Sequence, residues 1–260
     1  MMSAGFNQNP EVVKALLVAG AKLDAQDEKG GCALTAAAEL NENVDVIKVL
    51  IEAGADVNIK DKTGSTPLMW AARNPNLDVT KVLIDSGAKL NARNNEGGTP
   101  LLEAAFYNEN PEVIKLFLAS GSKITERDKK GWTALMYAAQ MKKNPEVIKT
   151  LLKAGAKIND RNADGYTALM IAAQNNENPE IISTYLKAGA NVNDQNNFKS
   201  TALTLAAEFN KNPEIVVELL NHGANAKLRD YDGKSAFDYV SANPNLKDSD
   251  AYWELNNARF

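Results

Sequence analysis

The chain has 260 residues, of which 44% are hydrophobic and 24% are charged, as is usual for a folded protein. Its net charge of −4, from 29 Lys and Arg against 33 Asp and Glu, does not favour nucleic-acid binding. No apolar run approaches the ~18 residues of a membrane helix, and one cysteine and one histidine exclude a disulfide and a cysteine-clustered zinc site. We therefore expect no nucleic-acid partner, no membrane contact, no metal and no cofactor.

Two short motifs recur along the chain in phase, which predicts a repeat protein. The first is Asn-Pro-Glu or a relative, beginning at Asn9, Asn43, Asn76, Asn110, Asn144, Asn178 and Asn212. The second is Thr-Pro-Leu, Thr-Ala-Leu or a relative, beginning at Cys32, Thr66, Thr99, Thr133, Thr167, Thr201 and Ser235. The period of 33–34 residues predicts one domain with a truncated N-terminal unit, repeats and a C-terminal capping unit, at 1–26, 27–60, 61–93, 94–127, 128–161, 162–195, 196–229 and 230–260.

The repeat 128–161 illustrates the expected local structure: a turn, a short helix and a longer helix. A short helix is predicted to begin at Thr133. Asn144 can cap the longer helix through its side-chain oxygen, and Pro145 suits the first helical position, where its missing N–H costs nothing. Gly155 suits the left-handed conformation that ends a helix. One repeat cannot bury its apolar stripe alone, so the pattern predicts an all-α solenoid of stacked repeats.

These motifs resemble those of the ankyrin repeat family. Residues 61–68 (Asp-Lys-Thr-Gly-Ser-Thr-Pro-Leu) and 94–101 (Asn-Asn-Glu-Gly-Gly-Thr-Pro-Leu), the Ala pairs that follow and the Leu-Leu-x-Ala-Gly-Ala stretches carry the resemblance, which covers essentially the whole chain. It implies an elongated ankyrin repeat solenoid with short hairpin turns, whose turn tips and short helices line a concave face that binds proteins. On resemblance alone we expect a bacterial protein. We also expect a cytoplasmic one, although a signal peptide could have been removed.

Three departures from the ankyrin pattern lead to further predictions. The family's histidine after Thr-Pro-Leu is absent, so its hydrogen bonds must be lost or replaced by packing. Lys199 occupies a turn-glycine position, where a left-handed backbone would cost ~1–2 kcal/mol, so we expect a reshaped turn. The chain begins inside a repeat, which predicts either a cut from a longer protein or a helix over 10–19 that caps the stack directly.

The C-terminal end is predicted to close the stack. Residues 246–255 read as a charged, amphipathic helix, as a terminal cap should be. We expect Tyr252 or Trp253, together with Leu255, to cover the last core face.

Large apolar residues at the turn tips and at the ends of the short helices are the candidate partner-binding residues. Exposed aromatic side chains are typical anchors of protein interfaces. The candidates are Trp132, Tyr166, Phe106, Tyr107, Met141, Phe198, Phe209, Tyr231 and Leu40, with the first four as the leading anchors. The alternative is that several of them only pack on the adjacent repeat.

A row of basic residues precedes the turns, as Lys60, Arg93, Arg127, Arg161 and Arg229. Arg93, Arg127 and Arg161 are candidates for binding acidic groups of a partner, whereas the alternative is a set of solvated charges and surface ion pairs. His222 and Cys32 are interpreted as structural, because no nucleophile and orienting acid accompany the histidine and the cysteine replaces a helix-opening Thr.

The sequence thus predicts a non-enzymatic protein-interaction module or scaffold, monomeric, with an unidentified protein partner. One alternative is end-to-end self-assembly through an uncapped N-terminal face that carries Val12, Val13, Leu16 and Leu17. Another is a substrate-targeting segment of a larger enzyme or effector.

Overall fold

The computed structural model describes residues 6–141 and 144–258, except for the side chain of Met141. It divides into two compact units, Met1–Lys129 and Lys130–Phe260, which we call the first and second units and describe separately. All named elements of the described residues are α-helices, which confirms the predicted all-α class. None of these helices has the length and apolar character needed to cross a membrane.

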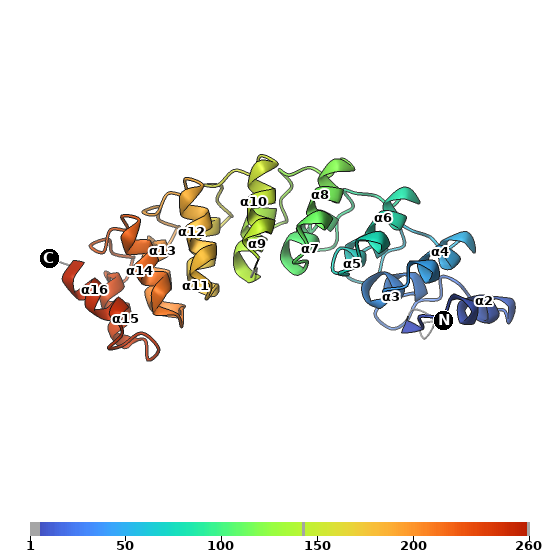
Figure 1. The fold of residues 1–260 in the computed structure, drawn as a ribbon, viewed down its shortest axis with the longest axis horizontal. Helices are drawn as coiled ribbons and strands as arrows, with labels where there is room; N and C mark the ends of the chain where they lie inside the picture. Colours follow the sequence, from blue (N-terminus) through green and yellow to red (C-terminus); the bar gives the residue numbers. More distant parts are fainter. Residues whose placement is uncertain (1–5, 142–143, 259–260) are drawn as a thin grey trace. The chain divides into compact units, whose positions relative to one another are not determined.

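The described residues of the first unit contain the unpaired helix α2 and three pairs of a short and a long helix (Figure 1). Its helices are α2 Pro10–Val18, α3 Ala33–Leu40, α4 Val44–Glu52, α5 Pro67–Ala71, α6 Leu77–Asp85, α7 Pro100–Tyr107 and α8 Pro111–Ala119. Within a repeat the short helix packs on the long helix that follows it, as α3 packs on α4. Between repeats the short helices α3, α5 and α7 pack in one row, and α2, α4, α6 and α8 pack in another.

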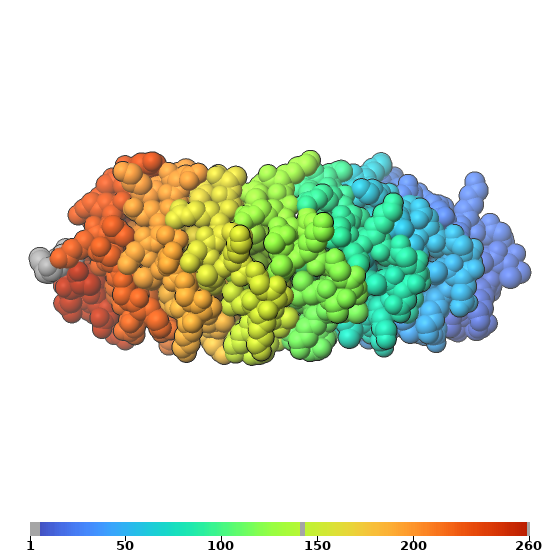
Figure 2. All heavy atoms as spheres, turned by 90° about the horizontal axis from the view of Figure 1, so that it is seen from above, coloured from blue at the N-terminus to red at the C-terminus, as the bar shows by residue number. Residues whose placement is uncertain are grey.

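The part of the second unit that the structure describes repeats this arrangement in four helix pairs. Its helices are α9 Ala134–Met141, α10 Pro145–Lys153, α11 Ala168–Asn175, α12 Pro179–Lys187, α13 Ala202–Phe209, α14 Pro213–Asn221, α15 Ala236–Ala242 and α16 Asp250–Ala258. The short helices again form one row and the long helices another. Within each unit the repeats follow one another in sequence order, as the successive bands of colour in Figure 2 show.

The long helices begin as the Asn-Pro-Glu motif predicts. The side chain of Asn144 accepts a hydrogen bond of 3.0 Å from the backbone N–H of Glu146, and Pro145 takes the first helical position. Asparagine caps α2, α4, α6, α8, α12 and α14 in the same way. An amide oxygen at this position satisfies one of the N–H groups that a helix start leaves without a partner.

The core lies between the two rows of helices in each unit. In the second unit Val147, Ile148 and Leu151 of α10 are fully buried, as are Ala138 and Ala139 of the preceding short helix. Alanine at these two positions lets neighbouring helix backbones approach closely, while the branched side chains fill the space between the rows. The same alternation of Ala pairs and branched residues recurs along both units.

The turns form a second ladder of contacts between repeats. Gly64 has a φ of +77°, and a Cβ atom there would lie 3.0 Å from the backbone nitrogen of Asn95 in the next turn. That nitrogen donates a hydrogen bond of 2.8 Å to the carbonyl oxygen of Thr63. Glycine therefore provides both the left-handed backbone and the room for this contact.

The prediction of a reshaped turn at Lys199 is wrong. Lys199 has a φ of +59°, and its backbone N–H donates to the carbonyl of Asn196 at 3.0 Å, as a glycine does in the other turns. The turn keeps its shape, and the backbone of Tyr231 in the next turn donates to the carbonyl of Phe198. The left-handed backbone of Lys199 therefore destabilises the fold by ~1–2 kcal/mol, but the hydrogen bonds between consecutive turns are kept.

The C-terminal cap differs in part from its prediction. Helix α16 begins at Asp250 rather than near residue 246, because the backbone is left-handed at Asp248, with a φ of +65°. Leu255 is fully buried as predicted. Of the two candidate aromatic residues, Tyr252 packs on Phe237 with ring centroids 5.3 Å apart, whereas Trp253 is 55% exposed.

Candidate functional site

We use the name turn face for the turn tips and the short helices of each unit taken together. Five of the predicted partner-binding residues on it have exposed side chains. They are Leu40, Tyr107, Phe198, Phe209 and Tyr231, between 47% and 67% exposed. Leu40, Tyr107 and Phe209 end the short helices α3, α7 and α13, whereas Phe198 and Tyr231 lie in consecutive turns of the second unit.

Three of the four leading anchors are less accessible than the prediction requires. Trp132, Tyr166 and Phe106 are half-buried. The ring of Trp132 packs on Tyr137 at a centroid distance of 5.2 Å, and Phe106 meets the edge of Tyr107 at 4.5 Å. Burial, with a smaller effect from the carboxylates of Asp164 and Glu208, raises the pKa of the Tyr166 phenol. The ring partners of Trp132 and Phe106 lie in the same repeats as these residues, so the contacts do not decide whether the residues pack on the adjacent repeat.

The last apolar candidate, Met141, ends helix α9, but its side chain lies outside the described residues. Binding through any of the nine apolar residues stays a prediction.

The basic row makes contacts within the chain. Arg93 Nη1 donates to the carbonyl of Arg127 at 2.7 Å, and its Nη2 forms an ion pair with Glu126. In the second unit Arg161 donates to the carbonyl of Gln195 at 2.6 Å and pairs with Asp194 at 3.1 Å. These side chains link each repeat to the next, as Lys60 does through the carbonyl of Arg93 at 2.9 Å. Partner binding by Arg93, Arg127 and Arg161 stays a prediction.

A side-chain cluster around Arg73 was not found by sequence reasoning. The guanidinium of Arg73 lies over the rings of both Trp70 and Tyr107, with its Cζ 4.3 Å and 4.1 Å from their centroids. Its Nη2 donates to Glu103 at 2.9 Å, while its buried Nε has no hydrogen-bond partner. One feature of the sequence could have indicated this cluster: the repeat 61–93 has one residue fewer than most others. Its short helix α5 ends at Ala71, and Arg73 follows soon after the helix.

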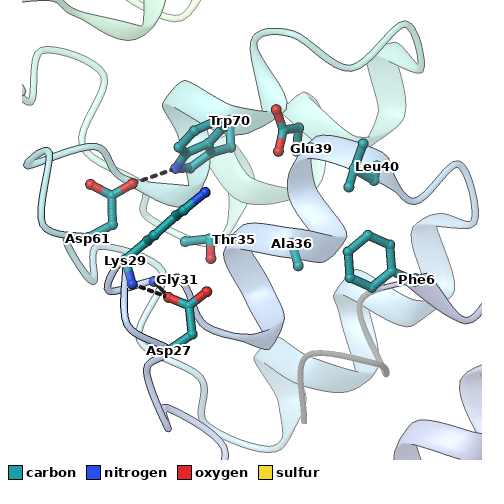
Figure 3. A pocket seen from close by; sticks show the side chains of 10 residues that line it. All are labelled: Phe6, Asp27, Lys29, Gly31, Thr35, Ala36, Glu39, Leu40, Asp61 and Trp70. Carbon is teal, nitrogen blue, oxygen red and sulfur yellow. Dashed lines mark hydrogen bonds between the residues drawn. The ribbon is translucent and has the colours of Figure 1, made fainter.

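A hollow of about 320 Å³ lies beside this cluster on the turn face of the first unit (Figure 3). Its lining combines apolar walls with three carboxylates and one ammonium group. The lining residues are Phe6, Asp27, Lys29, Gly31, Thr35, Ala36, Glu39, Leu40, Asp61 and Trp70. The indole N–H of Trp70 donates to Asp61 at 3.0 Å, which fixes the ring as one wall.

Comparisons with known proteins agree with the repeated architecture. The family described as "Ankyrin repeats (3 copies)" matches residues 1–94, 90–162 and 169–248, and "Ankyrin repeats (many copies)" matches residues 141–184. The chain belongs to the ankyrin repeat family. No individual curated protein matches it. Ankyrin repeats generally mediate protein–protein interaction, and proteins built from them are typically non-catalytic.

In this ankyrin repeat protein, apolar packing replaces the family's histidine. The residues that stand in its place, Met69, Leu102, Met136 and Met170, are all buried. Consecutive turns remain joined by backbone hydrogen bonds in the absence of that histidine, as between Asn95 and Thr63. At the equivalent position Thr204 closes a capping box with Thr201, accepting from its backbone N–H at 2.8 Å.

The residues weighed for catalysis have structural surroundings. His222 caps the end of α14, where its Nδ1 lies 2.9 Å from the carbonyl oxygen of Glu218. Cys32 is fully buried at the start of α3. Among residues 6–141 and 144–258, no three His, Cys, Asp or Glu side chains gather as metal ligands would.

Proposed function

We propose that this protein is a non-enzymatic interaction module that binds a partner protein through the exposed apolar side chains of its turn face. The observation that carries the proposal is the position of these side chains. In the second unit Phe198, Phe209 and Tyr231 are half-exposed or more, and they come from neighbouring turns and from the end of a short helix between them. Aromatic side chains of this kind release the most free energy when a partner covers them.

The backbone beneath these side chains supports a preformed binding surface. Tyr231 donates its N–H to the carbonyl of Phe198 at 3.1 Å, and Lys199 Nζ lies 5.0 Å from the centre of the Tyr231 ring. These contacts hold the two turn tips in register before any partner binds. A surface that is already ordered loses little conformational entropy on association, which favours affinity.

Substitution of Phe198 and Tyr231 together by Ala tests the proposal. Both side chains are exposed and their backbone hydrogen bonds remain, so circular dichroism and the melting temperature should be unchanged. We expect at least a roughly tenfold weaker capture of a partner from the lysate of the source cell, because two anchor residues are removed.

Trp253→Ala is the matched control, because Trp253 is an equally exposed aromatic residue that lies in α16, outside the turn face. Equal capture by the wild type and the Phe198→Ala/Tyr231→Ala variant would contradict the proposal.

A second double variant, Trp132→Ala/Tyr166→Ala, tests two of the leading anchors predicted from the sequence. Because Trp132 packs on Tyr137, this variant could be less stable than the wild type. Its capture of the partner is therefore measured well below the melting temperature of the variant.

End-to-end self-assembly is a second candidate function, favoured by the side chains of α2. Val13 is buried against the rest of the first unit, but Val12, Leu16 and Leu17 are only half-buried and Val18 is 90% exposed. Size-exclusion chromatography with light scattering tests this candidate. A Val18→Asp/Leu17→Asp variant should dissociate any oligomer, whereas a strictly monomeric wild type at high concentration would exclude the candidate.

A further inference from the structure

We propose that the hollow beside Trp70 in the first unit binds a basic side chain, Arg or Lys, that stands next to an apolar residue in the partner protein. This inference deepens the proposed function and rests on it, because it names the chemistry of the partner for one part of the turn face. The hollow, its charges and its walls carry the argument (Figure 3).

The hollow exists because two small residues occur in the same repeat. Ala36 stands at the short-helix position that holds a larger residue in every other repeat: Trp70, Glu103, Tyr137, Ile171, Leu205 and Tyr239. Gly31 stands at the turn position that holds Trp132 and Tyr166 in two repeats and the small residues Ser65, Gly98 and Ser200 in three others. With neither bulky side chain present, a space of about 320 Å³ opens between Trp70 and Phe6. The repeat 27–60 is the one whose sequence has small residues at both positions.

The walls and the rim suit different parts of one basic side chain. Trp70, Ala36, Leu40 and Phe6 offer apolar surface to an aliphatic stem or to a neighbouring apolar residue. Long basic side chains commonly lay their stems on apolar surface while the charged end stays among polar groups. A cavity with apolar walls and a few placed carboxylates thus matches an Arg or Lys side chain.

The rim has carboxylate oxygens available for a cation. Asp27 uses Oδ1 for the backbone N–H groups of Lys29 and Gly31, at 2.9 Å and 2.7 Å, which leaves Oδ2 for a ligand. Glu39 Oε1 forms a long ion pair with Arg73 Nη1, at 3.9 Å. When Arg73 is counted with Lys29, three lining carboxylates stand against two cations, so an excess of negative charge remains and the hollow favours a cation over an anion.

The side chain of Lys29 shows that the opening of the hollow can hold a long basic side chain. Its side chain extends across the opening toward Trp70 and Asp61, as Figure 3 shows. Lys29 is exposed, and its ammonium makes no ion pair with the carboxylates of the described residues. A basic side chain from a partner would enter the same opening, where the positive charge of Lys29 repels it, so that Lys29 opposes the binding.

The test uses the full chain and a library of random peptides displayed on phage. We expect the selected peptides to contain Arg or Lys beside an apolar residue. A fluorescein-labelled selected peptide then gives dissociation constants by fluorescence polarisation. Selection of acidic peptides, selection without enrichment of basic residues, or the absence of any binding peptide would overturn the inference.

Variants assign the binding to the hollow. Ala36→Trp fills it with a side chain found at the same position in another repeat, and binding should weaken about tenfold or more. Since Ala36 is largely buried, the smaller Ala36→Leu and the surface change Glu39→Gln serve as further variants, with Glu39→Gln expected to weaken binding about fivefold. Glu208→Gln is the matched control, because Glu208 occupies the position of Glu39 in the second unit.

Removing the positive charge of Lys29 tests whether the carboxylates of the hollow bind a basic side chain. Lys29→Ala should tighten the binding of a basic peptide about threefold at low salt, and this gain should shrink at high salt as charges are screened. Unchanged or weaker binding by Lys29→Ala would contradict the inference. Peptide binding that is lost in Phe198→Ala/Tyr231→Ala but insensitive to Ala36→Trp would overturn it while leaving the proposed function in place.

Discussion

The side-chain amide of Asn210 donates a hydrogen bond of 3.0 Å to the backbone carbonyl of Asn176, which stands 34 residues earlier at the same position of the preceding repeat. The same amide donates to Ala173 at 2.8 Å, and its oxygen accepts from the backbone N–H of Asn212 at 2.9 Å. Equivalent asparagines join the repeats of the first unit, where Asn108 donates to Asn74 at 2.8 Å. A ladder of buried amides thus connects successive loops between the helices of each unit.

Asn210→Ala should lower the free energy of unfolding by about 2 kcal/mol, because it leaves buried carbonyl and N–H groups without hydrogen-bond partners. Urea denaturation followed by circular dichroism measures this loss. Asn175→Ala is the matched control, since Asn175 is exposed and its amide donates to the carbonyl of Ile171 within its own helix, at 3.1 Å. The control should change stability by less than about 0.5 kcal/mol. Similar losses in both variants would show that the ladder contributes nothing beyond an ordinary loop residue.

The helices could be predicted from the sequence because their signals are local. Asn144, Pro145 and Gly155 each have one physical role at a helix end, and the structure places them there. The amide ladder could not be predicted in the same way. An asparagine in a loop is usually a solvated turn residue, and only its recurrence as Asn74, Asn108, Asn176 and Asn210 could indicate a buried role.

The candidate site was predicted less completely than the fold. The sequence predicts large apolar residues at the turns, but the exposure of each side chain depends on the residues that surround it in the fold. Trp132 and Phe198 are both predicted to be accessible, yet Trp132 is half-buried and Phe198 is 52% exposed. The hollow beside Trp70 is lined in part by small residues, Gly31 and Ala36. Such residues carry no functional group, so the sequence gives no chemical indication of a binding site at their positions.

Lys199→Gly should raise the free energy of unfolding by about 0.5–1 kcal/mol. The gain comes from relieving a left-handed non-glycine residue, less the greater backbone entropy of glycine in the unfolded chain. Differential scanning calorimetry should show a higher melting temperature. Lys234→Gly is the control, because Lys234 follows a turn glycine, has no left-handed backbone and should gain nothing. A lower melting temperature for Lys199→Gly would indicate that its contact with the Tyr231 ring outweighs the backbone strain.

Tyr185 should make stability depend on alkaline pH. The side chain is fully buried in α12, and its hydroxyl donates to the carbonyl of Leu135 in α9 at 2.8 Å. Burial raises the pKa of the Tyr185 phenol well above its usual value, and burial together with a hydrogen bond to Asp230 also raises the pKa of Tyr239. A raised pKa means that the folded state holds the proton more tightly than the unfolded state, whose phenol titrates at about 10.

The stability that these two phenols contribute is therefore fully present below pH ~10 and decreases as the pH rises above it toward the folded pKa values. Tyr185→Phe should lower the free energy of unfolding at neutral pH by about 1 kcal/mol, because the Leu135 carbonyl loses its partner. It should also flatten the decline of stability above pH ~10, since one phenol with a raised pKa is gone. Urea denaturation at a series of pH values measures both effects. Tyr231→Phe, at an exposed tyrosine, should reproduce neither, and an unchanged alkaline slope in Tyr185→Phe would exclude Tyr185 as a source of the pH dependence.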